Sequence, residues 1–214
     1  TYDATGNIAT ATDQTGETVS YKYDGLDRLI EVTDPLGSTI AYAYDAVGNL
    51  TTITDPTNRA TTYIYDNLNR LTTVSDAAGN ATQFGYDALG RRTSVTDPLN
   101  QTTTFVYDAI GRLITQTDPL NQITSYVYDA NGNRIRQTDR NDRVTEYDYD
   151  ALNRVVEERW LDDTSTVVRQ FSFAYDTVGN MTSVVDPDSV LNFTYDLLGR
   201  VKTADITGTP KLPD

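Results

Sequence analysis

Aspartates recur in two regular series, and a row of paired carboxylates could bind calcium or act as general acid and base. Alternatively, each carboxylate caps a turn by accepting hydrogen bonds from nearby backbone N–H groups. We favour capping, because an enzyme needs a catalytic pair once and not once per repeat, and neither an EF-hand loop nor the calcium-binding nonapeptide is present. The two series are exemplified by Asp24, Asp45 and Asp66 and by Asp34, Asp55 and Asp76.

Two further residue types recur in step with these aspartates. Arginines could bind anions, but we expect them to stack on a tyrosine or to pair with an aspartate of an adjacent strand. Tyrosines could form a platform for carbohydrate, although a buried stripe of core side chains is the interpretation that we favour. The arginines are Arg28, Arg70, Arg91, Arg112, Arg154 and Arg200.

The composition excludes several kinds of chemistry. Histidine and cysteine are absent, so catalysis by a Ser-His-Asp or Cys-His arrangement and zinc sites of His or Cys are ruled out within this chain. The formal net charge of −14 disfavours binding to nucleic acid, whose phosphates are also negative. No apolar run is long enough to insert into a membrane. We expect no cofactor, metal or catalytic residue.

These residues belong to an internal repeat marked by the dipeptide Tyr-Asp. Its first eight copies are spaced 21 residues apart, the ninth follows after 26 and the tenth after 20. Because the chain begins inside a repeat, we expect it to be a fragment of a longer protein. The tyrosines are Tyr2, Tyr23, Tyr44, Tyr65, Tyr86, Tyr107, Tyr128, Tyr149, Tyr175 and Tyr195.

Each repeat carries two turn signals. With the tyrosine as position one, position five is always Gly, Asn or Asp, the residues that tolerate a left-handed backbone, so we expect positive φ there. Position six is always Arg or Asn. Half a repeat further on, an Asp-Pro pair followed by Gly or Asn predicts a second turn, as at residues 34–37 and 97–100.

Short strands are predicted between the turns. Residues 60–65 and 71–75 are rich in β-branched and aromatic side chains, which favour strands. A second aromatic lies two residues before each repeated tyrosine from Tyr23 onward, and such a pair shares one strand face. The sequence therefore predicts an all-β fold of tandem antiparallel hairpins of about 21 residues. In a curved, twisted, solenoid-like strip, neighbouring hairpins would stack their aromatics into ladders.

The array is predicted to cover residues 1–202. Within it, residues 149–174 form an irregular, longer unit, and we expect its extra residues, 157–164, to lengthen a hairpin loop. Residues 203–214 lose the pattern and are expected to be an irregular C-terminal tail. The residues assigned a structural role in the repeat are Tyr23, Asp24, Tyr44, Asp45, Tyr65, Asp66, Tyr86, Asp87, Tyr107, Asp108, Tyr128, Asp129, Gly48, Gly90, Gly111, Gly132 and Gly179.

Residues 86–100, with the sequence YDALGRRTSVTDPLN, resemble the YD repeat, also called the RHS repeat. The resemblance extends over residues 1–202. It implies the β-strip of bacterial Rhs toxins, toxin-complex shell subunits and animal teneurins, which spirals into a hollow shell. In bacteria that shell encloses a toxin polypeptide, and in teneurins it serves adhesion. The plug and the self-cleaving segment that end bacterial shells are not visible in this sequence.

The leading hypothesis is a non-enzymatic scaffold: a partial YD shell that encapsulates or presents an attached C-terminal polypeptide or toxin domain. The alternative is an adhesion or carbohydrate-binding module at a cell surface, with glycans as partners. A third, weaker hypothesis is a hydrolase that uses carboxylates alone. The resemblance implies a secreted or cell-surface bacterial protein, and unpaired sheet edges could associate edge to edge.

Overall fold

The computed structural model describes residues 1–208, which form β-strands joined by turns, without any helix. Accordingly, no helix in this part of the chain has the length and apolar character needed to cross a membrane. The strands divide between two compact units, residues 1–104 and the part from Phe105 onward, which are described separately.

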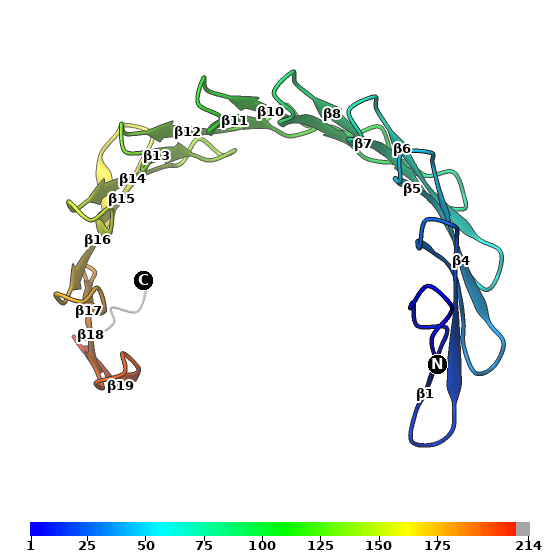
Figure 1. Cartoon of the computed structure of the whole chain (residues 1–214). Helices are drawn as coiled ribbons and strands as arrows, with labels where there is room; N and C mark the ends of the chain where they lie inside the picture. Colours follow the sequence, from blue (N-terminus) through cyan, green and yellow to red (C-terminus); the bar gives the residue numbers. More distant parts are fainter. Residues whose placement is uncertain (209–214) are drawn as a thin grey trace. The chain divides into compact units, whose positions relative to one another are not determined.

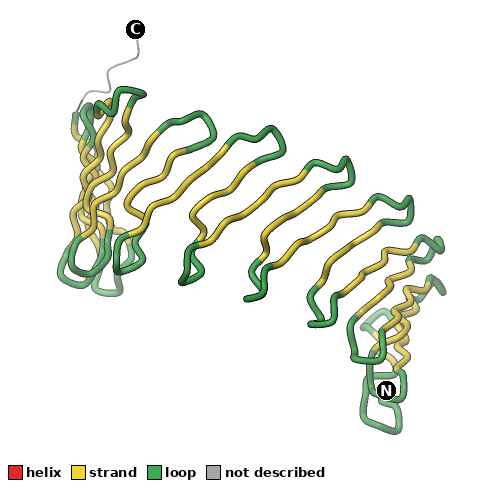
Figure 2. Tube along the Cα trace, turned by 90° about the horizontal axis from the view of Figure 1, so that it is seen from above, coloured by secondary structure: helices red, strands yellow, loops and turns green. Residues whose placement is uncertain are grey.

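Unit one is an antiparallel strip in which each strand pairs with the next one along the chain, so hairpin follows hairpin with turns along both edges (Figures 1 and 2). Its last strand, β10 (Thr102–Tyr107), pairs with β9 through residues 102–104. The others are β1 (Thr10–Thr12), β2 (Thr18–Tyr23), β3 (Leu29–Thr33), β4 (Thr39–Tyr44), β5 (Leu50–Thr54), β6 (Ala60–Tyr65), β7 (Leu71–Ser75), β8 (Ala81–Tyr86) and β9 (Arg92–Thr96).

Unit two continues the same antiparallel order from β11 onward. The predicted all-β class and the tandem hairpins are thus confirmed in both units. Its strands are β11 (Leu113–Thr117), β12 (Ile123–Tyr128), β13 (Arg134–Thr138), β14 (Val144–Tyr149), β15 (Val155–Leu161), β16 (Val167–Tyr175), β17 (Met181–Val185), β18 (Val190–Tyr195) and β19 (Val201–Thr207).

The predicted left-handed residues close the turns. Every position-five residue has positive φ, from 59° at Asp27 to 99° at Gly48 and Gly179. Each Tyr-Asp turn has a three-residue loop whose last residue is left-handed, a common hairpin geometry. The turn at residues 186–189 is shorter, with a bond from Asp186 N to Ser189 O and no residue of positive φ. Near each Tyr-Asp turn the strand register shifts by one residue, as between Lys22 and Tyr23, and such bulges increase strand twist.

The expected buried stripe of aromatic side chains is wrong. Among residues 1–208, Leu161 is the one buried hydrophobic side chain, at 9% exposure, and the repeated aromatics are only partly covered. The reason is architectural: a single sheet has no second layer to cover either of its faces. Alternation with period two places the aromatics on one face, but it does not supply a partner for that face.

The extra residues of the long unit lengthen its strands and not its loop. β15 has seven residues and β16 has nine, whereas the equivalent strands β3 and β2 have five and six. The turn between β15 and β16 keeps the usual hydrogen bonds, from Asp162 N to Thr166 O and from Ser165 N to Asp162 O. The predicted loop insertion at residues 157–164 is therefore wrong, because paired strands satisfy the backbone of the added residues.

The last repeat also differs from expectation. Residues 203–207 belong to β19, which pairs with β18 from Val201 to Thr207, so the irregular tail expected from residue 203 does not begin there. Thr203 bonds Thr194 through their hydroxyls at 2.7 Å. Residues 209–214 of the expected tail lie outside the described part of the chain.

Candidate functional site

Each repeated aspartate organises the turn that it begins. Oδ1 of Asp24 accepts hydrogen bonds from the N–H groups of Leu26 at 2.9 Å and Arg28 at 3.1 Å. Its own N–H donates to the Arg28 carbonyl, and its carbonyl accepts from the N–H of Asp27. Asp34 accepts an equivalent pair of bonds in the second kind of turn. These carboxylates therefore cap turns, as the sequence analysis favoured.

The same bonds keep the carboxylates ionised. The hydrogen bond from the side chain of Arg28 lowers the pKa of Asp24 most, and the hydrogen bond from the backbone N–H of Arg28 lowers it further. The backbone N–H of Asp188 and the side chain of Arg169 lower the pKa of Asp186 to about 2. At neutral pH these groups are acceptors and charges, and they do not act as proton donors.

The two aspartate series lie at opposite ends of the strands. Asp24 and Asp34 flank β3, whose five residues place them roughly 17 Å apart at the usual rise per residue. Paired catalytic carboxylates in glycoside hydrolases are separated by about 5–10 Å. Within one hairpin, the recurring aspartates therefore do not form such a pair.

Arginine at position six connects one turn to the next repeat. Nε of Arg28 donates to Oδ2 of Asp24 at 2.7 Å, and Nη2 approaches the same oxygen at 2.6 Å. Nη1 donates to the carbonyl of Asp45 at 3.1 Å, and the guanidinium lies 4.7 Å from the ring centroid of Tyr44. One side chain thus holds its own turn, the following turn and the following tyrosine.

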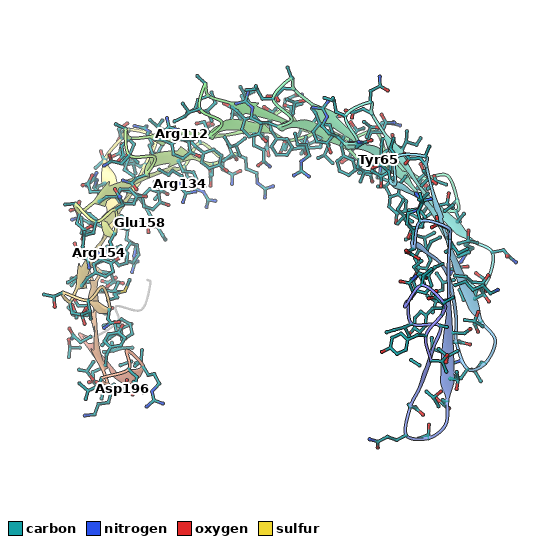
Figure 3. The ribbon with its side chains drawn as sticks, in the orientation of Figure 1. Tyr65, Arg112, Arg134, Arg154, Glu158 and Asp196 are labelled. Carbon is teal, nitrogen blue, oxygen red and sulfur yellow. The ribbon has the colours of Figure 1, made fainter. Side chains whose placement is uncertain are left out.

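This arrangement recurs in both units. Arg70 lies over the ring of Tyr86 at 4.9 Å in unit one. In unit two, Arg112, which is labelled in Figure 3, lies over the ring of Tyr128 at 4.7 Å. The predicted stacking on tyrosine is confirmed for these arginines, whereas their aspartate partner belongs to their own turn and not to an adjacent strand. The expected ladder of ring on ring is, at these places, an alternation of guanidinium and ring.

The tyrosine hydroxyl makes a second link between repeats. Oη of Tyr65 donates to the carbonyl of Leu50 in the preceding repeat at 2.9 Å (Figure 3). Leu50 is where the register shifts by one residue opposite Tyr44, so the hydroxyl reaches the chain at its bulge. The same bond is made by Tyr44, Tyr86, Tyr128, Tyr149, Tyr175 and Tyr195.

Asparagine at position six makes a different link. Nδ2 of Asn49 donates to Oδ2 of Asp45 in its own turn at 2.8 Å and to Oδ1 of Asn69 in the next repeat at 2.9 Å. Asn7 bonds Asp27 in the same way at 2.8 Å. In unit two, Asn133 bonds Asn153 at 2.8 Å.

The residue at position six therefore matches position five of the following repeat. Where position six is Asn7, Asn49 or Asn133, position five of the next repeat is Asp or Asn, which accepts its hydrogen bond. Where position six is arginine, position five of the next repeat is glycine, as it is for Arg28, Arg70, Arg112 and Arg154. Asn180 is the exception, since Gly199 follows it. This link does not show within a single repeat, but it can be read from the sequence by comparing position six with the next position five.

The residues assigned to the repeat all lie in this network or beside it. Each tyrosine of the set ends a strand and each aspartate begins the turn that follows. The glycines, from Gly48 to Gly179, occupy the left-handed exit of that turn. Across residues 1–208, no group of three or more Asp, Glu, His or Cys side chains is placed to hold a metal ion.

The RHS repeat pattern matches residues 2–39, 44–81, 65–102, 86–123, 107–139 and 128–159. The chain belongs to the RHS repeat family. The hairpin with its Asp, Arg and Tyr is therefore the RHS repeat unit of this chain. Among curated proteins, none matches it.

Solved structures share the fold of this RHS-repeat chain. The crystal structure of TcdB2-TccC3 without its hypervariable C-terminal region is 18% identical, with a TM-score of 0.57, over 95% of this chain. The Tc holotoxin pore of Photorhabdus luminescens with a TccC3 mutation is 16% identical, with a TM-score of 0.52, over the same share. The chain spans only 13% and 16% of those proteins, and at these identities the likeness is one of fold.

Proposed function

We propose that this RHS-repeat chain is a non-enzymatic structural segment of a shell wall that encloses or presents a polypeptide attached to the same protein. The observation that carries the proposal is that the polar side chains of each repeat bond to the neighbouring repeat. The repeated aspartate organises its own turn, and the position-six Arg or Asn and the tyrosine hydroxyl bond that turn and hairpin to a neighbouring one.

A strip of this kind suits a wall. It is one sheet thick, and it is held by links between successive repeats and not by a core of its own. Each repeat contacts its chain neighbours, so length can grow without a larger core, as in other repeat proteins. The solved relatives are parts of a toxin complex, and one of them is defined by a removed hypervariable C-terminal region.

By analogy with those relatives, we propose that the attached polypeptide is a toxin domain and that the protein is secreted or lies at the bacterial cell surface. The analogy supports a toxin domain as the kind of partner. The chain itself would act without covalent chemistry, by excluding proteases and solvent from what it surrounds.

A protection experiment tests this proposal. A protease site is introduced into the attached polypeptide of the protein that contains this segment, and cleavage is followed with time. We expect slow cleavage in the intact protein and fast cleavage when Arg112→Gln and Arg154→Gln weaken the wall, because both arginines clamp successive repeats.

The matched control changes Arg59 and Arg143, which pair with aspartates of their own turns and are 72% and 75% exposed. Arg59→Gln and Arg143→Gln should leave protection unchanged. Equal cleavage rates in the intact protein and in the Arg112/Arg154 variant, with the variant shown to have lost its repeat links, would exclude a protective wall.

A further inference from the structure

The hairpin formed by β15 and β16 has added strand residues that the links between repeats do not use. Its turn at residues 162–166 has the hydrogen bonds of the ordinary turns, and Tyr175 still donates to the carbonyl of Val155. The repeat links are thus intact, although the strands extend further than elsewhere. The added length brings a set of side chains with no counterpart in the other repeats.

Those side chains form an aromatic cluster. The ring of Trp160, the single tryptophan of the chain, lies 5.4 Å from the ring of Phe171 at an angle of 56°. Its Nε1 donates to Oε1 of Glu158 at 2.6 Å, which fixes the orientation of the indole. Arg169 lies over the other aromatic ring at 5.2 Å. Trp160 nevertheless remains 44% exposed, so much of a rigidly held indole is available to a ligand.

A depression of about 380 Å³ lies beside this indole. Its apolar part includes Trp160 and Leu161, the one buried hydrophobic residue of the described chain. Its polar part includes Thr145, Glu158 and the ion pair of Arg143 with Asp139. A hollow of this size that is apolar with a few placed polar groups is typical of sites for small molecules.

An ordinary repeat provides an internal comparison. A depression of about 320 Å³ in unit one has the same ion pair, formed by Arg59 and Asp55 at the equivalent repeat positions. Its remaining lining is Ile53, Thr61, Asp76, Ala77 and Ala78, with no aromatic ring. The hollow beside Trp160 therefore differs from the hollow at the equivalent place in the ordinary repeat by its aromatic wall, whereas both have two carboxylates, an arginine and a threonine.

We propose that this depression binds a neutral saccharide ring. A pyranose presents C–H groups on one face, which pack on an indole, and hydroxyls on its edge, which need both acceptors and donors. The surface for the C–H groups is the indole of Trp160. The acceptors and donors for the hydroxyls come from Glu158, Asp139, Thr145 and Arg143. This site is independent of the wall proposed above, because the wall's links do not use it.

The charges and the backbone argue against other ligands. Two carboxylates and one arginine, already paired with Asp139, disfavour an acidic sugar or a phosphate. β15 pairs with both β14 and β16, so a peptide strand finds no free edge here. A small neutral ring with hydroxyls remains the ligand that matches the surface.

The single tryptophan makes the test direct. The chain is titrated with glucose, galactose and N-acetylglucosamine, and with cellobiose, lactose and chitobiose, while the emission of Trp160 is followed. Glucuronic acid and glucosamine are titrated in the same way, as an acidic and a basic sugar for comparison. We expect a saturable change with at least one neutral sugar and a weaker response to the acidic one.

Two variants connect the signal to the site. Trp160→Leu keeps apolar packing against Phe171 but removes the indole, so calorimetric binding should be lost while circular dichroism is unchanged. Arg143→Ala should weaken binding roughly threefold to tenfold, the usual cost of one or two lost hydrogen bonds. Arg59→Ala, the matched change in unit one, should leave the affinity unchanged.

Three results would overturn the proposal. One is that no neutral sugar changes the emission of Trp160 in a saturable way, even at concentrations well above the millimolar range. Another is binding that survives in a folded Trp160→Leu variant, which would place the ligand elsewhere. The third is an acidic sugar that binds more tightly than every neutral one, which would contradict the charge argument.

Discussion

The guanidinium of Arg28 lies 4.7 Å from the ring centroid of Tyr44, and it also holds the carboxylate of Asp24, so one side chain joins two repeats. The contact is partly shielded, since the Arg28 side chain is 26% exposed. Ion pairs at a fully exposed surface contribute little, whereas a planar guanidinium that stacks and bonds at once contributes more. The stability of the strip should therefore depend more on the arginines at position six than on exposed arginines such as Arg59 and Arg143, which lie at position sixteen of their repeats.

Replacing Arg112 with lysine tests this dependence. The charge is kept, but the stack on Tyr128 and the forked bonds to Asp108 and the Asp129 carbonyl are lost. We expect a loss of about 1–2 kcal/mol in the free energy of unfolding. Urea denaturation measures it, and hydrogen exchange should show faster opening at both repeats. The control, Arg59→Lys, concerns a side chain 72% exposed and should change stability by less than about 0.5 kcal/mol.

Tyr65→Phe removes the hydroxyl that donates to the carbonyl of Leu50 and nothing else. We expect a cost of about 0.5–1.5 kcal/mol, because a partly covered carbonyl loses its partner at the bulge. Tyr63→Phe is the matched control, since the Tyr63 hydroxyl makes no hydrogen bond to any residue in 1–208. Equal effects of the two changes in thermal unfolding would contradict the assigned role of the Tyr65 hydroxyl.

Gly90→Val tests the left-handed turn. Gly90 has φ of 82°, and a Cβ there would meet nothing within 4 Å, so any cost comes from the backbone and not from a clash. A β-branched residue in this conformation should lower stability by about 1–2 kcal/mol or more. Gly90→Asn should cost less than Gly90→Val, because Asn69 occupies the same repeat position at φ of 60°. Its remaining cost is the mismatch with Arg70, since the arginines at position six are followed by glycine at the next position five. Unchanged denaturation midpoints in both variants would refute the turn assignment.

A double change tests the match between position six and the next position five. Asn49→Arg and Asn69→Gly should each destabilise the strip, because each leaves a mismatched neighbour. Together they recreate the Arg-then-Gly combination of Arg28 and Gly48, so the double variant should recover most of the loss. A coupling of about 1 kcal/mol is expected from a double-mutant cycle. Combining Asn49→Arg with Asp27→Gly, whose own partner is Asn7, should give additive effects.

The lowered pKa values of the turn aspartates predict acid sensitivity. A carboxylate whose folded pKa lies below its ordinary value of 3.8 stabilises the fold above pH 3.8, and that contribution disappears as the pH falls through the folded pKa. For Asp186 the window runs from 3.8 down to about 2. Thermal unfolding midpoints should fall steeply in that range and be nearly flat from mildly acidic to neutral pH. A flat profile through the window would show that the turn bonds do not contribute.

Much of the fold follows from the sequence because turns are local. Gly48 and Asn69 need no distant partner to adopt positive φ, and alternation in residues 60–65 is a property of one strand. The burial of the aromatics could not be predicted in the same way. Whether Tyr63 and Tyr65 are covered depends on a second layer, and a period of two is the same with and without one.

The site shows the same division. The sequence indicates that Arg28 should meet an aspartate and a tyrosine, but only the registered strands decide that they are Asp24 and Tyr44. Extra residues near a turn are compatible with a longer loop and with longer strands, so the sequence alone does not place residues 157–164. Trp160 instead pairs with Thr145 on one side and Arg169 on the other, so the added length is sheet.

The match between position six and the next position five has a consequence for how such a gene can lengthen or shorten. Duplicating residues 107–127 would place a copy of Gly111 after Arg112, a junction of the accepted kind. Duplicating residues 44–64 would place a copy of Gly48 after Asn49, where the amide keeps Asp45 but finds no acceptor in the next repeat. Unequal crossing-over between the coding segments of different repeats should therefore be tolerated at some repeats and selected against at others. The Asn180–Gly199 junction has the form that such an event leaves behind.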